Sequence, residues 1–107
     1  MNNSKNIIFS IATILIVAIS FGQNSQLILL NKYINEVAID SSKKSIDNLK
    51  KLNLTKPQKA KFNYLLANYY KLINEDDLAY KNYLEAKNNY KELDSISQVA
   101  KINIEMT

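Results

Sequence analysis

The sequence predicts an all-α protein made of short antiparallel helices. One Gly and one Pro in 107 residues are too few for the many tight turns of a sheet protein. Apolar residues recur every three or four positions along most of the chain, which is the spacing of a helix that buries one face. Short polar breaks, such as residues 40–42, separate these stretches. A chain of this length forms at most one small domain.

Residues 1–22 are typical of an export signal. A single lysine precedes a charge-free apolar run at residues 7–21, and the small residues Ser20 and Gly22 predict cleavage before Gln23. As a helix this run spans about 22 Å, less than the hydrocarbon core of a bilayer at about 30 Å. We therefore expect an exported protein, periplasmic or secreted. Two alternatives stay open: residues 7–21 are retained as a membrane anchor, the only membrane contact of the chain, or they form a buried core helix.

Two helices are expected between the cleavage position and residue 55. Asn24 or Ser25 is expected to cap the first helix, and Asp40 or Ser41 the second, which is expected at Ser42–Leu52. The inward stripe expected for the first helix is Leu27, Leu30, Ile34 and Val37. The inward stripe expected for the second helix is Ile46, Leu49 and Leu52.

The clearest helix start in the chain is Thr55. Gln58 follows it at the spacing of a capping box, and Pro57 lies in the first turn, where its missing N–H costs nothing. An acidic turn then separates two helices, expected at about residues 56–73 and 77–93. The residues expected to face inward are Phe62, Leu65, Leu66, Tyr69 and Ile73, followed by Ala79, Tyr83, Ala86, Tyr90 and Leu93. The alanines among them allow the two helix backbones to approach closely.

The acidic turn contains the densest cluster of carboxylates, Glu75, Asp76 and Asp77. A calcium loop would need a Gly and further oxygen ligands at fixed offsets, and the sequence places none there. Acidic residues at a helix start are favoured by the helix dipole without any ion. We therefore predict a helix start here and no metal site.

Residues 60–93 resemble the tetratricopeptide repeat, a helix pair of about 34 residues that stacks into a solenoid. The matching residues are Leu66, Ala67 and Tyr70 on the first helix and Ala79, Tyr83 and Ala86 on the second. The sequence departs from the family at Asn63, where an aromatic is common, at Ala67, where Gly is common, and at Lys91, where Pro is common. The resemblance implies antiparallel helix pairs stacked as a solenoid, with an ordinary helical hairpin in a bundle as the alternative.

The same resemblance divides the exported chain, residues 23–107, into a degenerate repeat at 23–55, the best repeat at 56–93 and a partial repeat at 94–107. In the partial repeat a fifth helix is expected to start at Asp94 and Ser95, and residues 100–103 echo residues 60–63. No later helix in the sequence is available to cover the apolar residues Ile102, Ile104 and Met106. We therefore predict the N-terminal fragment of a longer protein. The alternative is a complete short protein whose last helix docks on itself or on a second copy.

The composition argues against catalysis and against nucleic-acid binding. Without Cys or His the chain has no disulfide, thiol nucleophile, His-based zinc site or Ser-His-Asp triad. The one Gly lies in the leader, so a Gly-rich phosphate loop is absent. The 14 lysines are interleaved with 10 acidic residues, and no arginine offers a fork for phosphates or guanines. We therefore predict that the protein is not an enzyme, needs no cofactor and binds no nucleic acid. A basic nucleic-acid-binding protein is a further alternative, but the export signal argues against it.

The resemblance also implies a site, because the first helix of each pair lines the concave face in this family. The residues this places as peptide contacts are Lys61, Tyr64, Asn68 and Lys71, and the alternative is a solvated helix face. Tyr64 and Tyr80 lie off the apolar stripes and are expected to face solvent or a groove. The function implied is an exported scaffold that binds a peptide or protein segment.

The leader ends in Phe-Gly-Gln, which is similar to exported proteins of the Bacteroidetes. There, by resemblance, such repeat arrays form the sensory N-terminal part of membrane-bound signalling regulators. The alternative is a membrane-anchored helical structural protein that retains its N-terminal segment.

Overall fold

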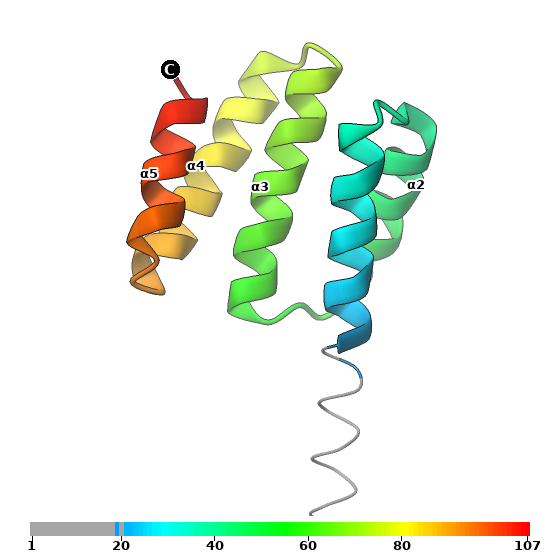
Figure 1. The fold of residues 1–107 in the computed structure, drawn as a ribbon, viewed down its shortest axis with the longest axis horizontal. Coiled ribbons are helices and arrows are strands. Elements are labelled where there is room, and N and C mark those ends of the chain that lie inside the picture. Colours follow the sequence, from blue (N-terminus) through cyan, green and yellow to red (C-terminus); the bar gives the residue numbers. More distant parts are fainter. Residues whose placement is uncertain (1–18, 20) are drawn as a thin grey trace, which may run out of the picture.

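The computed structural model describes residues 19 and 21–107, and the described part is helical without any strand (Figure 1). The first helix is described over residues 21–35. Four further helices follow: α2 (Ile39–Lys50), α3 (Lys56–Leu72), α4 (Asp76–Glu92) and α5 (Ile96–Glu105). The all-α prediction is confirmed. The predicted export signal lies almost wholly outside the described residues, and within them no helix is long and apolar enough to cross a membrane.

The helices lie in two layers (Figure 1). The first helix, α3 and α5 form one layer, and α2 and α4 lie behind them. We call the first helix and α2 the first hairpin, and α3 and α4 the second hairpin. Helices in each hairpin run antiparallel, and α5 returns alongside α4, so that each helix packs against its neighbours in the sequence.

Three of the four helix connections close in the same way. Each contains one residue with a left-handed backbone, namely Val37 (φ 57°), Asn74 (φ 62°) and Asp94 (φ 55°). The N–H of the next residue donates to the carbonyl five residues back, as in Ala38 to Tyr33, Glu75 to Tyr70 and Ser95 to Tyr90, at 2.9, 2.8 and 2.9 Å. This is a Schellman-type closure, which satisfies carbonyl groups that the helix end leaves free.

Val37 does not belong to the inward stripe predicted for the first helix. Its side chain is 58% exposed because the residue lies in the left-handed turn, beyond the last helical residue. A β-branched residue rarely adopts this backbone, which costs about 1–2 kcal/mol. The turn therefore takes its shape from the packing of the hairpin and not from the preference of Val37. The other three residues of the stripe, Leu27, Leu30 and Ile34, are buried as predicted.

The connection from α2 to α3 is longer and ends in the predicted capping box. The Thr55 hydroxyl accepts from the Gln58 N–H at 3.4 Å, and Gln58 Oε1 accepts from the Thr55 N–H at 3.0 Å. Gln58 Nε2 also donates to Asn24 Oδ1 at 3.1 Å, which links the start of α3 to the first helix. The predicted cap at Asn24 or Ser25 is therefore wrong. The helix already includes residue 21, and Asn24 bonds across to α3 instead.

The predicted start of α2 is also corrected. The helix begins at Ile39, three residues before the expected Ser42, and its N-cap is Ala38 without a side-chain hydrogen bond. Asp40 and Ser41 consequently lie within its first turn and cap nothing. The physical reason is the turn closure at Ala38. It reverses the chain two residues before Asp40, so the helix begins before a polar side chain that could cap it. Ser42 is fully buried, and its hydroxyl has no hydrogen-bond partner in the described structure.

The core of the second hairpin is built from tyrosine and alanine. The alanines Ala60, Ala67, Ala79 and Ala86 are almost completely buried, and so are Tyr64, Tyr69, Tyr83 and Tyr90. The stripes predicted for α3 and α4 are confirmed, with Ile73 and Leu93 partly buried at their ends. An ion pair between Lys56 and Glu92 joins the start of α3 to the end of α4.

The fifth helix covers more apolar surface than the sequence indicated. Ile102 is fully buried in the core cluster where α5 packs against α4, and Met106 is partly buried there. Only Ile104, at 74% exposure, matches the prediction of an uncovered apolar residue. The prediction was wrong for Ile102 because α4 already offers a surface on which α5 docks.

Candidate functional site

The four predicted contact residues share one face of α3, and this face meets α5. The Tyr64 hydroxyl donates to Glu105 Oε1 at 3.5 Å. Lys71 Nζ lies 3.7 Å from the other oxygen of the same carboxylate. Glu105 thus connects two residues of α3 that are two turns apart. We call the surface formed by Lys61, Tyr64, Asn68 and Lys71 of α3 with Lys101 and Glu105 of α5 the inner face.

Tyr64 is buried, contrary to the prediction that it faces solvent or a groove. Its side chain is 6% exposed, and the Tyr83 ring lies beside it with centroids 6.0 Å apart. The stripe of α3 alone does not account for this burial, because α4 and α5 supply the covering groups. Tyr80, the second tyrosine predicted off the stripe, is 57% exposed.

Two lysine ammonium groups lie over the Tyr64 ring. Lys61 Nζ is 5.7 Å and Lys101 Nζ is 5.2 Å from the ring centroid, within the range of a cation–π contact. Neither ammonium forms an ion pair with a carboxylate of the described residues. Burial, and then the positive charge of Lys101, lower the pKa of Lys61. The inner face therefore holds two like charges close together, and an anionic group would relieve their repulsion.

Asn68 is held in place by Tyr83. The Tyr83 hydroxyl donates to Asn68 Oδ1, so the amide NH₂ of this half-buried side chain keeps its capacity to donate. Burial, followed by the negative charges of Glu105 and Tyr64, raises the pKa of Tyr83 to about 12. The hydroxyl therefore remains a donor across the physiological pH range and holds the Asn68 side chain in one orientation.

A concavity of about 400 Å³ adjoins this network at the end of the hairpin. Lys71, Tyr83 and Glu105 of the inner-face network line it, together with exposed Tyr80. The three helices α3, α4 and α5 all contribute to its wall. The predicted contacts and this concavity are thus continuous.

Sequence reasoning missed Lys101, Glu105 and the hydroxyl role of Tyr83. The signal for Lys101 was present, because Lys101 follows Lys61 by 40 residues within the repeated segment at residues 100–103. Nothing in the sequence pattern pointed to Glu105, because it reaches Tyr64 and Lys71 only once α5 has packed beside α3. Tyr83 was predicted as a core residue, which is correct for its ring.

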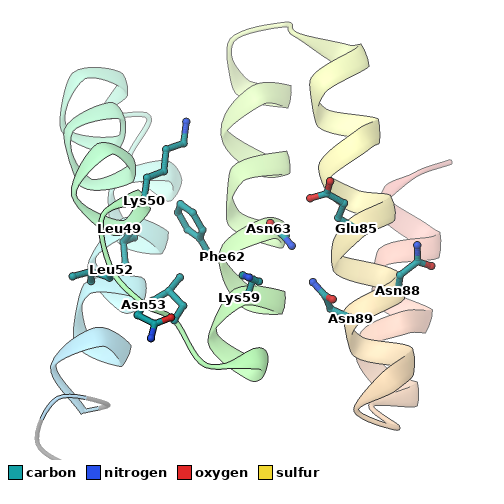
Figure 2. A pocket seen from close by; sticks show the side chains of 11 residues that line it. Leu49, Lys50, Leu52, Asn53, Lys59, Phe62, Asn63, Glu85, Asn88 and Asn89 are labelled. Carbon is teal, nitrogen blue, oxygen red and sulfur yellow. The ribbon is translucent and has the colours of Figure 1, made fainter. Parts of the chain in front are cut away.

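A second concavity, the outer groove, lies on the opposite side of α3 and was not predicted (Figure 2). Its volume is about 530 Å³. Residues from α2, from the connection to α3, and from α3 and α4 line it: Leu49, Lys50, Leu52, Asn53, Leu54, Lys59, Phe62, Asn63, Glu85, Asn88 and Asn89.

The acidic turn starts a helix, as predicted. Glu75 is the N-cap of α4, without a side-chain hydrogen bond, and Asp76 and Asp77 lie in the first turn. There the two carboxylates face the positive end of the helix dipole. Among the described residues, no group of three or more His, Cys, Asp or Glu side chains is placed to hold a metal ion.

Comparison with protein-family models, with characterised proteins and with solved structures finds no match for this chain.

Proposed function

We propose that this chain is a tetratricopeptide-like repeat scaffold that binds an acidic peptide or protein segment on its inner face. The observation that carries the proposal is the pair Lys61 and Lys101. Both ammonium groups lie over one tyrosine ring, and neither has a carboxylate partner in the described structure. The proposed activity is recognition without chemistry.

The recurrence of burial supports the repeat part of this proposal. In the first hairpin the buried residues include Gln23, Leu27, Leu30, Ser42, Ile46 and Leu49. Displaced by 37 residues, these positions become Ala60, Tyr64, Ala67, Ala79, Tyr83 and Ala86, which are also buried. The left-handed turn residues Val37 and Asn74 differ by the same 37 positions. Two hairpins with one burial pattern are what stacked repeats require.

In the proposed binding, each residue of the inner face has a separate role. A ligand carboxylate lies between the ammonium groups of Lys61 and Lys101 and accepts a hydrogen bond from each. Such charge-assisted hydrogen bonds are stronger than those between neutral groups. Asn68 donates to a neighbouring oxygen of the ligand, and the Tyr64 ring forms the floor. Glu105 neutralises Lys71 and repels a second acidic group, so the acidic end of the ligand is directed toward Lys61.

Peptide binding tests this role directly. The probe is a fluorescein-labelled peptide of alternating glutamate and leucine, followed by fluorescence anisotropy, with glutamine in place of glutamate as the neutral control. Replacing Lys61 and Lys101 together with Ala should weaken binding by tenfold or more, because charged hydrogen bonds contribute about 1.5–3 kcal/mol each. Lys81→Ala is the matched control, since Lys81 is exposed on α4 and lies outside the inner face. Equal affinity in the double variant and the parent would refute the proposal.

The pH dependence provides a second readout of the same site. Only the protonated ammonium attracts the acidic probe, and the pKa of Lys61 is lowered. Affinity should therefore fall as the pH rises through a value below that of an ordinary lysine. Lys61→Arg keeps its charge throughout this range, so the variant should shift the fall to higher pH.

We further propose that the protein is exported and that its scaffold serves as the sensory N-terminal part of a membrane-bound regulator. The composition of residues 1–22 supports export, and the regulator role rests on the family resemblance. N-terminal sequencing of the protein from the envelope of its host tests export. A chain that starts at Gln23 would support it. An intact N-terminus in the membrane fraction would favour the anchored structural protein.

A further inference from the structure

Helix α5 is the counterpart of α3, one repeat later in the chain. Residues 98–103 repeat residues 58–63 with Gln, Ala, Lys and Asn at the same four places. The core sides of the two helices also correspond. Phe62 of α3 is directed toward α2 (Figure 2), and the equivalent Ile102 is fully buried where α5 packs against α4. Helix α5 is therefore placed against α4 as α3 is placed against α2.

The opposite side of α5 is uncovered, although the same side of α3 is buried. In α3 this side contains Ala60 and Tyr64, which are buried where the antiparallel helix α4 packs on α3 (Figure 1). The equivalent residues of α5 are Ala100, which is exposed, and Ile104, which is 74% exposed. Ile96, two turns before Ile104, is 81% exposed. We call Ile96, Ala100 and Ile104 the α5 stripe. The second hairpin thus shows what covers such a side, namely an antiparallel helix.

We propose that a second copy of this chain covers the α5 stripe, with the two α5 helices packed antiparallel across a two-fold axis at Ala100. A symmetric dimer requires a surface that is complementary to itself. The stripe meets this requirement, because Ile, Ala and Ile follow one another at intervals of four residues and read the same in both directions. Ile96 of one copy then meets Ile104 of the other. The central alanine allows the helices to approach closely, as the alanines do between α3 and α4.

The distribution of charge favours pairing through α5. The α5 stripe is uncharged, and the two charged residues of the helix, Lys101 and Glu105, contact residues of α3 at the inner face. The exposed surface of α2, in contrast, carries Lys43, Lys44 and Lys50. Two copies that met through α2 would bring these like charges together, which is unfavourable.

A concavity beside Ile96 provides a seat for Ile104 of the other copy. Its volume is about 150 Å³, which is enough for one aliphatic side chain. The residues that line it are Lys91, Asp94, Ser95, Ile96 and Val99. The two-fold axis repeats this contact at the other end of the stripe. An interface centred on one helix of 10 residues is small, so we expect a weak dimer with micromolar affinity.

The dimer leaves the inner face of each copy open. The Lys101 ammonium lies over the Tyr64 ring of α3 and takes no part in the α5 stripe. The assembly therefore presents two inner faces, and a ligand with two acidic segments gains affinity by occupying both. The variant with Lys61 and Lys101 both replaced by Ala should still dimerise, and Ile104→Glu should keep its acidic-peptide binding. The dimer and the proposed peptide binding are thus tested separately.

Sedimentation equilibrium of the full chain tests the pairing. The parent should dimerise, and Ile104→Glu should weaken the dimer by about tenfold or more, because symmetry removes two apolar contacts and introduces two charges. Ile28→Glu is the matched control, since Ile28 is 71% exposed on the first helix, and it should leave the dimer unchanged. A parent that stays monomeric at millimolar concentration would overturn the proposal. A dimer that Ile104→Glu does not weaken would overturn it as well.

A cysteine at the proposed axis tests the antiparallel geometry. The chain has no cysteine of its own. In Ala100→Cys the two introduced thiols should lie within reach of a disulfide, so mild oxidation should link two copies. Glu85→Cys, at an exposed residue of the outer groove, is the control and should remain unlinked. Adding Ile104→Glu to Ala100→Cys should reduce the linking. If Ala100→Cys stays unlinked, or links no faster than Glu85→Cys, the two-fold axis at Ala100 is wrong.

Discussion

The two hairpins bury the same positions with different side chains. Leu30 and Leu49 are fully buried in the first hairpin, and 37 residues later Ala67 and Ala86 are fully buried in the second. The first hairpin is filled with aliphatic residues of similar size. The second alternates tyrosine with alanine, so that large rings fit beside closely spaced backbones. One backbone arrangement is therefore compatible with two kinds of core.

The difference between the cores has a chemical consequence. A tyrosine ring fills space as leucine does but carries a hydroxyl at its far end. In the second hairpin these hydroxyls reach Asn68 and Glu105 at the inner face. The equivalent positions in the first hairpin, Leu27 and Ile46, provide no polar group. The proposed binding face thus depends on the aromatic filling of one hairpin.

The largest expected effect on stability comes from replacing a buried leucine of the first hairpin with the alanine found at the equivalent position of the second. Leu30→Ala places in the first hairpin the residue that the second has at Ala67, without a tyrosine to fill the gap. The cavity should lower the free energy of unfolding by about 2–5 kcal/mol, measured by urea denaturation. Ile28→Ala is the control, because Ile28 lies on the same helix at 71% exposure and should cost less than about 0.5 kcal/mol. Equal losses would mean that the first hairpin is not packed as described.

The converse substitution should break the aromatic core. Ala86→Leu places in α4 the side chain that α2 has at Leu49. Because Ala86 is fully buried among the tyrosines, overpacking should cost about 1–3 kcal/mol. Ala100→Leu, at an exposed alanine of α5, should leave the urea midpoint nearly unchanged. An unaltered midpoint for Ala86→Leu would contradict close packing in the second hairpin.

The smallest expected effect on stability concerns the turns of the two hairpins. Exchanging their left-handed residues tests whether the two turns are equivalent. Val37 and Asn74 have nearly the same left-handed backbone, which asparagine tolerates and valine does not. Val37→Asn should stabilise the protein by about 1 kcal/mol, and Asn74→Val should destabilise it by a similar amount. Thermal melting measures both, since 1 kcal/mol corresponds to roughly 4–8 °C for a domain of this size. Shifts of the same sign in both variants would show that the turns are not equivalent.

Features that depend on nearby residues were predictable from the sequence. The capping box at Thr55 requires only Gln58, three residues away, and it was found with its helix start. The apolar stripes of α3 and α4 follow from helical spacing alone, and they are buried. The four residues of the predicted site do share a face of α3, because helical periodicity fixes which residues lie together.

Features that depend on packing between distant segments could not be predicted. Tyr64 was expected to face solvent or a groove, but Tyr83 of α4 and Lys101 of α5 cover its ring. Val37 continues the apolar spacing of the first helix, and only the turn closure removes it from that stripe. Asn63 appeared in the sequence only as a departure from a family pattern. Its burial, at 9% exposure, becomes visible only when α3 and α4 are assembled.

The tyrosine filling also makes the second hairpin optically distinct. The chain has seven tyrosines and no tryptophan, and six of the tyrosines lie in α3 and α4. Near-ultraviolet absorbance and intrinsic emission therefore report almost entirely on the second hairpin. Far-ultraviolet circular dichroism reports on every helix. Recorded on one sample, the two signals distinguish a chain that melts as a unit from one whose first hairpin opens alone, and no label is required.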